Sequence, residues 1–185
     1  MERTFVMIKP EGVQRSLIGD IIKRIEQVGL RIVAMKMIQP TREFVEKFYP
    51  SDNEWFKSVG ARAKESFIRQ GLDVKKSYGS EDSTEMGKVV KKWLIDTITR
   101  GPVVGMVIEG NRAIIIVRKM CGNTYPDIAL PGTIRGDFST ESVEEANVQG
   151  RAIWNVIHAS GNEEEAKNEI NLWFRKEDIM SYRDE

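Results

Sequence analysis

Histidine and cysteine are almost missing from this sequence, which has one of each in 185 residues. A structural zinc site takes about four Cys or His ligands, and a catalytic zinc site takes about three protein ligands. The sequence therefore excludes zinc chemistry. The single cysteine, Cys121, also cannot form an internal disulfide, which favours a reducing compartment.

Long apolar runs and an excess of charge are missing too. No segment approaches the roughly 18 consecutive apolar residues of a membrane-spanning helix, and the start, MERTFVMIKPEG, lacks the apolar core of a signal peptide. Lys plus Arg and Asp plus Glu balance at 28 each. The chain therefore has no net positive charge that would attract it to nucleic acid or to an anionic membrane. We expect a cytoplasmic protein whose partners are small or local.

The common glycine-rich signatures of phosphate and nucleophile chemistry are also missing. The sequence contains no G-x-x-x-x-G-K-[ST], no G-x-G-x-x-G and no G-x-S-x-G. These patterns mark phosphate-binding loops, dinucleotide-binding turns and nucleophile elbows. If the protein handles phosphate, it does so without a glycine cradle.

What is present is an alternation of strands and helices in a chain whose length favours one domain. The apolar periodicity predicts strands over residues 3–9, 30–38, 103–110 and 152–160, and helices over 18–28, 41–49 and 160–174. Two further apolar stretches at 55–68 and 84–98 have helical spacing, and we expect them to form an added helical subdomain. Residues 121–137 are dense in turn residues and predict a long loop.

His158, the only histidine, ends a predicted strand two residues before Ser160, the expected helix cap with Glu163 in capping-box register. Backbone N–H groups at such a place favour a neutral imidazole and stabilise an anion attached to it. Glu169 lies two to three turns into the helix, and helical side chains lean toward the N-terminus, so its carboxylate can approach the ring. On these features alone, His158 can equally be a polar strand-end residue and Glu169 a solvated charge.

Four blocks spread along the chain resemble the nucleoside diphosphate kinase family and occur in the family's order. They are TFVMIKPEGVQRSLIGDIIKRIEQVGLRIVAMKM, GPVVGMVIEGNRAI, PGTIRGDF, and NVIHAS followed by A-x-x-EI-x-LWF. The resemblance covers roughly the first 50 residues, then 101–138 and 152 to the end. We interpret residues 1–185 as a single kinase-like domain with insertions at about 53–97 and 140–150.

The resemblance implies a ferredoxin-like α/β sandwich, a four-stranded antiparallel sheet covered by helices. It also implies a helix over NRAIIIVRKM, residues 111–120, where β-branching alone suggests a strand. The family transfers the γ-phosphoryl of a nucleoside triphosphate to a nucleoside diphosphate by a ping-pong mechanism through phosphohistidine. His158 matches the phosphorylated histidine, Glu169 the carboxylate that holds its ring, and Ser160 a member of the same hydrogen-bonded group.

Further residues match the family's nucleotide contacts. The resemblance assigns the phosphates and ribose to Lys9, Tyr49, Arg118, Thr124, Arg135 and Asn155, with Phe56 or its neighbour Trp55 as the base-stacking aromatic. Singly, each has an ordinary structural interpretation, such as a surface charge or a turn residue. The family also implies Mg²⁺ bridging the substrate's phosphates, and assembly into a homo-oligomer, a hexamer or a tetramer.

Two residues depart from the family pattern beside the histidine. Gly161 stands where the family usually has Asp, and Ala159 replaces a commoner glycine. The missing carboxylate keeps open a catalytically weak kinase-like protein that binds nucleotide or a protein partner. Two further alternatives are an RNA-binding module on the same fold and a divergent phosphohistidine relay protein. An RNA-binding module would want exposed aromatics on the sheet and a basic face, and neither is evident. Base preference cannot be derived from the sequence.

Overall fold

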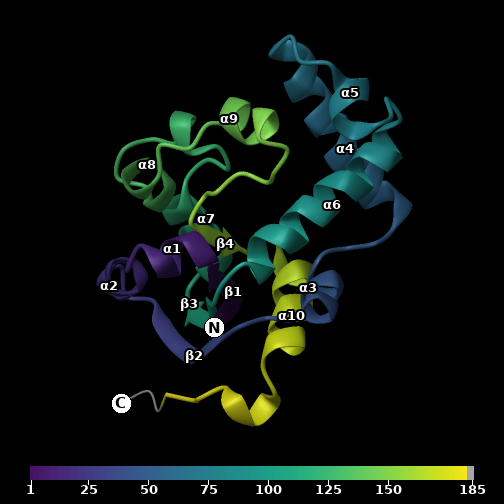
Figure 1. Ribbon diagram of the computed structural model, residues 1–185. Helices are drawn as coiled ribbons and strands as arrows, with labels where there is room; N and C mark the ends of the chain where they lie inside the picture. The colour runs from purple at the N-terminus through teal and green to yellow at the C-terminus, as the bar shows by residue number, and fades with distance from the viewer. Residues whose placement is uncertain (183–185) are drawn as a thin grey trace. The chain divides into compact units, whose positions relative to one another are not determined.

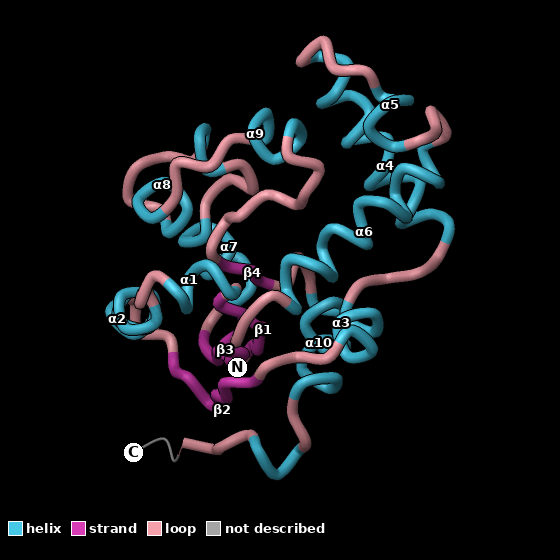
Figure 2. The backbone as a smooth tube through the Cα atoms, in the orientation of Figure 1, coloured by secondary structure: helices cyan, strands magenta, loops and turns pink. Residues whose placement is uncertain are grey.

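The computed structural model describes residues 1–182 and divides them into two compact units. The first unit comprises residues 1–40, 101–140 and the chain from 155 onward, and the second comprises residues 41–100 and 141–154. Figure 1 labels their elements, and Figure 2 distinguishes helices from strands. Each unit has its own cluster of buried apolar side chains, so each is described by itself.

The first unit is built on a four-stranded sheet in the order β2-β3-β1-β4. Its strands are β1 (Glu2–Ile8), β2 (Arg31–Ile38), β3 (Val103–Gly110) and β4 (Ile157–Ala159). Every neighbouring pair is antiparallel, which confirms the expected sheet and gives the strand order of a ferredoxin-like sandwich. Its helical elements are α1 (Pro10–Gln14), α2 (Ile18–Gln27), α7 (Ala113–Cys121), η1 (Pro126–Ile128), α8 (Ile134–Phe138), α10 (Glu163–Trp173) and η2 (Lys176–Asp178).

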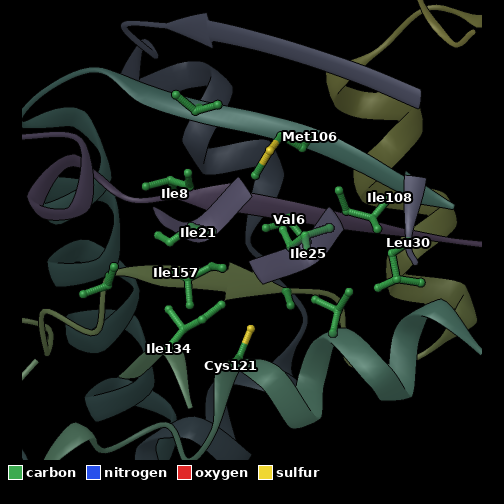
Figure 3. Close-up of a cluster of buried hydrophobic side chains, with 14 of the residues drawn as sticks. Val6, Ile8, Ile21, Ile25, Leu30, Met106, Ile108, Cys121, Ile134 and Ile157 are labelled. Carbon is green, nitrogen blue, oxygen red and sulfur yellow. The ribbon is translucent and has the colours of Figure 1, made fainter. Parts of the chain in front are cut away.

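Strand alternation gives the central strand β1 two different buried faces. Val6 and Ile8 pack with Ile21, Ile25 and the side chains of α7 in the cluster drawn in Figure 3. On the opposite face Phe5 packs against α10, with its ring centroid 4.9 Å from that of Trp173. The sheet is thus covered by helices on both sides, and side chains from β4 must point to one side or the other.

The helix that the resemblance implied over residues 111–120 is present as α7, Ala113–Cys121, against its β-branched composition. In α7 the buried residues Ala113, Ile114, Val117 and Cys121 follow helical spacing, while Ile115 is 54% exposed. The intrinsic preference of Ile and Val for strands is weak, and the packing of one helical face on the sheet outweighs it.

The last strand and the cap of the last helix differ from the prediction. β4 covers only Ile157–Ala159 instead of residues 152–160, because Val156 has a φ of 68° and interrupts the extended backbone. The predicted Ser160 cap is wrong: Asn162 caps α10, its side chain accepting from the N–H of Glu165 at 2.9 Å. The Ser160 hydroxyl instead bonds to Glu169 and to the backbone of Phe5.

The second unit is helical, as expected for the added subdomain. Its helices are α3 (Arg42–Phe48), α4 (Asn53–Arg69), α5 (Val74–Tyr78), α6 (Ser83–Thr99) and α9 (Val143–Val148). Asp52, Asp73 and Asp82 cap α4, α5 and α6 with their carboxylates, which stabilises each helix start. Because Tyr78 is buried with Phe67, Val74 and Met86, the polar stretch that follows α5 is anchored at its start.

The long helices α4 and α6 lie side by side and touch through their backbones (Figure 1). A Cβ added at Gly60 would lie 1.7 Å from Ser83 O, and one added at Gly87 would lie 2.1 Å from Phe56 O. Only glycine permits helices to approach so closely at these points. Within residues 1–182 no helix is long and apolar enough to cross a membrane.

Candidate active site

His158 is placed by strand pairing and strand alternation. It lies opposite Met7 in the β1–β4 ladder. Its neighbours Ile157 and Ala159 point into the cluster of Figure 3, so His158 points to the α10 side of the sheet. There its ring centroid lies 6.2 Å from that of Phe5, and its side chain is 23% exposed. The imidazole therefore packs on a buried side chain, Phe5, but is itself accessible to solvent.

Glu169 and Ser160 hold this ring in a defined orientation. Glu169 Oε1 lies 2.8 Å from His158 Nε2, and the Ser160 hydroxyl donates to Glu169 Oε2 at 2.6 Å. The expected approach of the carboxylate to the imidazole is therefore present. Since a carboxylate accepts a hydrogen bond from Nε2–H, the neutral ring carries its hydrogen there and its lone pair at Nδ1. That tautomer makes Nδ1 the nucleophilic atom.

The backbone just before β4 turns sharply at Val156. Ile157 N donates to Asn155 O at 2.7 Å, a three-residue γ-turn centred on the positive φ of Val156. Such a conformation costs a β-branched residue on the order of 1–3 kcal/mol. Two contacts hold it: Val156 N donates to Glu11 Oε1 at 3.1 Å, and Val156 O accepts from Lys9 N at 2.8 Å. The turn brings Asn155 into contact with the end of β1.

Lys9, Asn155 and Thr124 form a polar network beside this turn. Lys9 Nζ donates to Asn155 Oδ1 at 2.6 Å, and Asn155 Nδ2 donates to the backbone carbonyl of Thr124 at 2.8 Å. Burial lowers the pKa of Lys9 to about 8, while the Glu11 carboxylate opposes this and Arg135 adds to it. The structure thus brings together three of the residues that the resemblance assigns to nucleotide.

Arg135 makes more hydrogen bonds within the protein than a residue whose only role is to bind phosphate would need. Its guanidinium donates to three backbone carbonyls, those of Gly122 at 3.0 Å, Ile157 at 2.8 Å and Asn155 at 3.3 Å. Burial lowers its pKa from the ordinary value. Three of its five N–H groups brace the γ-turn and the loop after α7, which leaves two for a ligand. Arg118, on the last turn of α7, donates to Ala159 O at 3.4 Å.

Tyr49 and Phe56 belong to the second unit and are described there. Tyr49 is the residue after α3 and its ring lies 6.4 Å from that of Trp55, which in turn lies 5.6 Å from Phe56 on α4. The predicted phosphate-side hydroxyl and the predicted base-stacking aromatics therefore form one aromatic group. Their roles stay predictions.

Glu11 is a site residue that the sequence did not reveal. It is 5% exposed, its Oε1 holds the γ-turn, and its charge supports the protonated form of Lys9. The only sequence signal is an acidic residue directly after a buried strand and Pro10. That pattern is too common to single it out, because acidic residues are ordinary in the first turn of a helix.

Comparison with known families decides how this arrangement is interpreted. The sequence pattern of a single family, described as nucleoside diphosphate kinase, matches residues 2–68 and 73–179. The chain belongs to the nucleoside diphosphate kinase family. It is accordingly a phosphotransferase, of a family that acts on nucleoside di- and triphosphates.

Individual relatives in the nucleoside diphosphate kinase family are similar over nearly the whole chain. One from Pyrobaculum aerophilum is 44% identical over 180 residues, covering 97% of this chain and 98% of the relative. The crystal structure of an NDP kinase from that organism matches with a TM-score of 0.96 at 43% identity, covering 97% of this chain and 99% of the other. A Borrelia burgdorferi enzyme, solved as a transition state mimic with vanadate and ADP, matches with a TM-score of 0.78 at 37% identity, over 99% and 92%.

Gly161, which departs from the usual family pattern, lies against a carboxylate. Gly161 N donates to Glu165 Oε2 at 2.7 Å, and a Cβ added at residue 161 would lie 2.8 Å from the same oxygen. Glu165 therefore occupies the space in which a side chain at residue 161 would begin.

Proposed function

We propose that this chain transfers the γ-phosphoryl group of a nucleoside triphosphate to a nucleoside diphosphate through a phosphohistidine at His158. The observation that carries the proposal is the 2.8 Å contact between His158 Nε2 and Glu169, which keeps the hydrogen of the neutral ring on Nε2 and the attacking lone pair on Nδ1. In the first half-reaction Nδ1 bonds to the γ-phosphorus, and the bond from that phosphorus to the β,γ-bridging oxygen breaks. The diphosphate leaves with that electron pair, and the second half-reaction runs the same step in reverse on another diphosphate.

Glu169 and Ser160 act on the ring and not on the phosphate. When Nδ1 is phosphorylated, the imidazole becomes positive, and the carboxylate at Nε2 stabilises that charge without the proton having to leave. Ser160 fixes the second carboxylate oxygen at 2.6 Å. The ring therefore needs no reorganisation between its free and phosphorylated forms.

We assign the substrate contacts to the cations and polar groups around the γ-turn and to the aromatics of the second unit. Phosphoryl transfer depends mainly on alignment and charge neutralisation. Arg118, the two remaining N–H groups of Arg135 and the Thr124 hydroxyl supply these for the phosphates, while Lys9 and Asn155 bond to the phosphate or the ribose hydroxyls. Tyr49 is assigned to the γ-phosphoryl and Phe56 to the base.

Mg²⁺ is assigned to the nucleotide's phosphates, where it would neutralise charge. Among residues 1–182 no three His, Cys, Asp or Glu side chains gather as a metal site, so the phosphates would be its principal ligands. Glu165, in the first turn of α10 and bonded to the backbone of Gly161, is the carboxylate that we assign to the metal or its waters.

We propose in addition that residues 1–185 act as one cytoplasmic domain that assembles into a homo-oligomer. Met35 and Met37, each 55% exposed on the edge strand β2, support an interface there. Measuring the native mass by analytical ultracentrifugation tests the assembly, and a mass of about 21 kDa would contradict it.

Incubation with γ-labelled ATP tests the proposed chemistry. We expect acid-labile label on the protein and its transfer to added diphosphate. Because His158 is the only histidine, any phosphohistidine must be His158. His158→Ala should lose the label while circular dichroism shows a retained fold. Exchange by the His158→Ala protein would overturn the assignment, and a wild type that never becomes labelled would favour a binding protein.

A further inference from the structure

Lys91, on α6 of the second unit, carries a buried ammonium held by a cage of oxygens. The residue is 8% exposed. Its Nζ donates to the backbone carbonyls of Tyr49 at 2.8 Å, Glu46 at 3.1 Å and Pro50 at 3.1 Å, and to the Ser51 hydroxyl. The oxygens surround the charge much as they would surround a bound cation. Within the described chain no carboxylate forms an ion pair with this ammonium.

These acceptors belong to one segment, the end of α3 and the turn that leads to α4. The last carbonyls of a helix have no partner within the helix and carry its partial negative charge. Lys91 supplies those partners from outside, so its charge fixes the backbone of the turn that carries Tyr49. The same residues, with Glu43 and Lys47, line a pocket of about 490 Å³.

Lys91 also reaches the aromatic group on α4. Its Nζ lies 5.9 Å from the centre of the Phe56 ring, within the range of a cation–π contact. One side chain therefore contacts the backbone of Tyr49 and the ring of Phe56, the two residues that the proposed function assigns to the nucleotide in this unit.

We propose that Lys91 is a positioning residue for nucleotide binding, an internal cation that holds the turn at residues 49–51 so that Tyr49 and Phe56 meet the substrate. The inference rests on the proposed function. The contacts of Lys91 lie within the second unit, so its loss should change affinity for nucleotide and leave the reactivity of the imidazole intact.

Lys91→Met tests this because methionine keeps most of the apolar stem and removes the charge. We expect the Kd of ADP, measured by calorimetry, to rise roughly tenfold or more, since the three carbonyls of residues 46, 49 and 50 lose the donor that holds the turn. The KM for ATP should rise in parallel, with kcat at saturation within about threefold. Labelling of His158 by phosphoramidate, a donor without base or ribose, should match the wild type. Lys92→Met, which changes an exposed neighbour, is the matched control.

Chemical rescue separates the positioning role from a general packing defect. In Lys91→Ala the oxygen cage is left open, and we expect propylammonium to lower the Kd of ADP toward the wild-type value. Tetramethylammonium, which has the charge but no N–H, should not. Equal effects of the two ions, or a wild-type Kd in Lys91→Met, would overturn the proposal. If the wild type binds ADP but is never labelled by ATP or phosphoramidate, the proposed phosphohistidine chemistry fails. The Kd of ADP for the wild type and for Lys91→Met still decides the role of Lys91.

Discussion

Lys9 shows how one buried amine can be tuned by its neighbours. It lies at the end of the central strand, with Asn155 Oδ1 as its acceptor and with Glu11 and Arg135 close enough to act on its charge. Burial is the largest of these influences and lowers its pKa from 10.5 to about 8. The charge that would meet the nucleotide is therefore lost at a much lower pH than on a surface lysine.

This shift predicts an alkaline limb in the activity of the enzyme. As pH rises through about 8, Lys9 loses its proton and its attraction for nucleotide, so kcat/KM should fall with an apparent pKa near 8. A Lys9→Arg variant stays protonated throughout this range and should lose the limb, even if its maximal rate is lower. A pH profile of both proteins measures this, and an unchanged limb in Lys9→Arg would assign it to another group.

The same shift predicts the direction of a stability change. Between about pH 8 and 10.5 the unfolded chain keeps the proton that the folded protein has released, so stability rises with pH in this window. Relative to Lys9→Met, the wild type should gain about 2 kcal/mol from pH 8 to pH 10. Urea unfolding at the two pH values measures this difference, and parallel pH dependence of the two proteins would contradict the buried, charged state.

Among the elements, the close crossing of α4 and α6 is the most sensitive to substitution. Gly87→Ala should destabilise the protein by about 1–3 kcal/mol, because the new methyl group meets Phe56 O at 2.1 Å. The gain in helix propensity of up to about 1 kcal/mol is too small to offset this. Since Phe56 is displaced, KM for nucleotide should rise as well.

Gly19→Ala is the matched control for this substitution. Gly19 lies in α2, and a Cβ there meets nothing within 4 Å. That variant should be as stable as the wild type or slightly more stable. Urea unfolding followed by tryptophan fluorescence compares the three proteins. A Gly87→Ala protein as stable as Gly19→Ala would show that the helices are not in backbone contact.

The sequence predicted elements well where one pattern dominated. The strands β1, β2 and β3 and the helices α3 and α6 follow directly from apolar periodicity and turn residues. The strand over 152–160 was predicted too long, because the positive φ of Val156 depends on contacts with Lys9 and Glu11, which lie some 145 residues earlier in the chain. Local sequence carries no information about such a contact.

The site was predicted in part for the same reason. His158 and Glu169 are only 11 residues apart, so a strand end followed at once by a helix whose side chains lean toward its N-terminus allowed their approach to be expected. The three carbonyls that Arg135 braces, the position of Glu11 and the cage around Lys91 depend on how distant segments pack. Residue type and spacing cannot specify these contacts, and the resemblance proposed residues for the site without revealing how they are held.

At the scale of the whole molecule, the question is whether the two units unfold together. Three of the four tryptophans, Trp55, Trp93 and Trp154, lie in the second unit, while the sole histidine lies in the first. Intrinsic fluorescence and the imidazole proton resonance therefore report mainly on different units. The proposal of a single domain requires that both signals change at one temperature.

Phe67→Ala tests this cooperativity. Phe67 is fully buried in the second unit, so its truncation should cost about 3–5 kcal/mol and lower the melting temperature by roughly 10 °C. In one cooperative domain the fluorescence and imidazole midpoints fall together. If fluorescence alone shifts and the imidazole signal keeps its wild-type midpoint, the units are separate domains.

The position of β1 at the centre of the sheet has a consequence for how the chain is made. β1 is synthesised before its partners β3 and β4, which begin at Val103 and Ile157. At ~5–20 residues per second, the segment holding Phe5, Val6, Met7 and Ile8 waits roughly 10–30 s before β4 is synthesised. Until then four side chains that end fully buried lack the cover of β4 and α10. We therefore expect β1 to need a chaperone for longer than α4, α5 and α6, which can pack locally as they emerge.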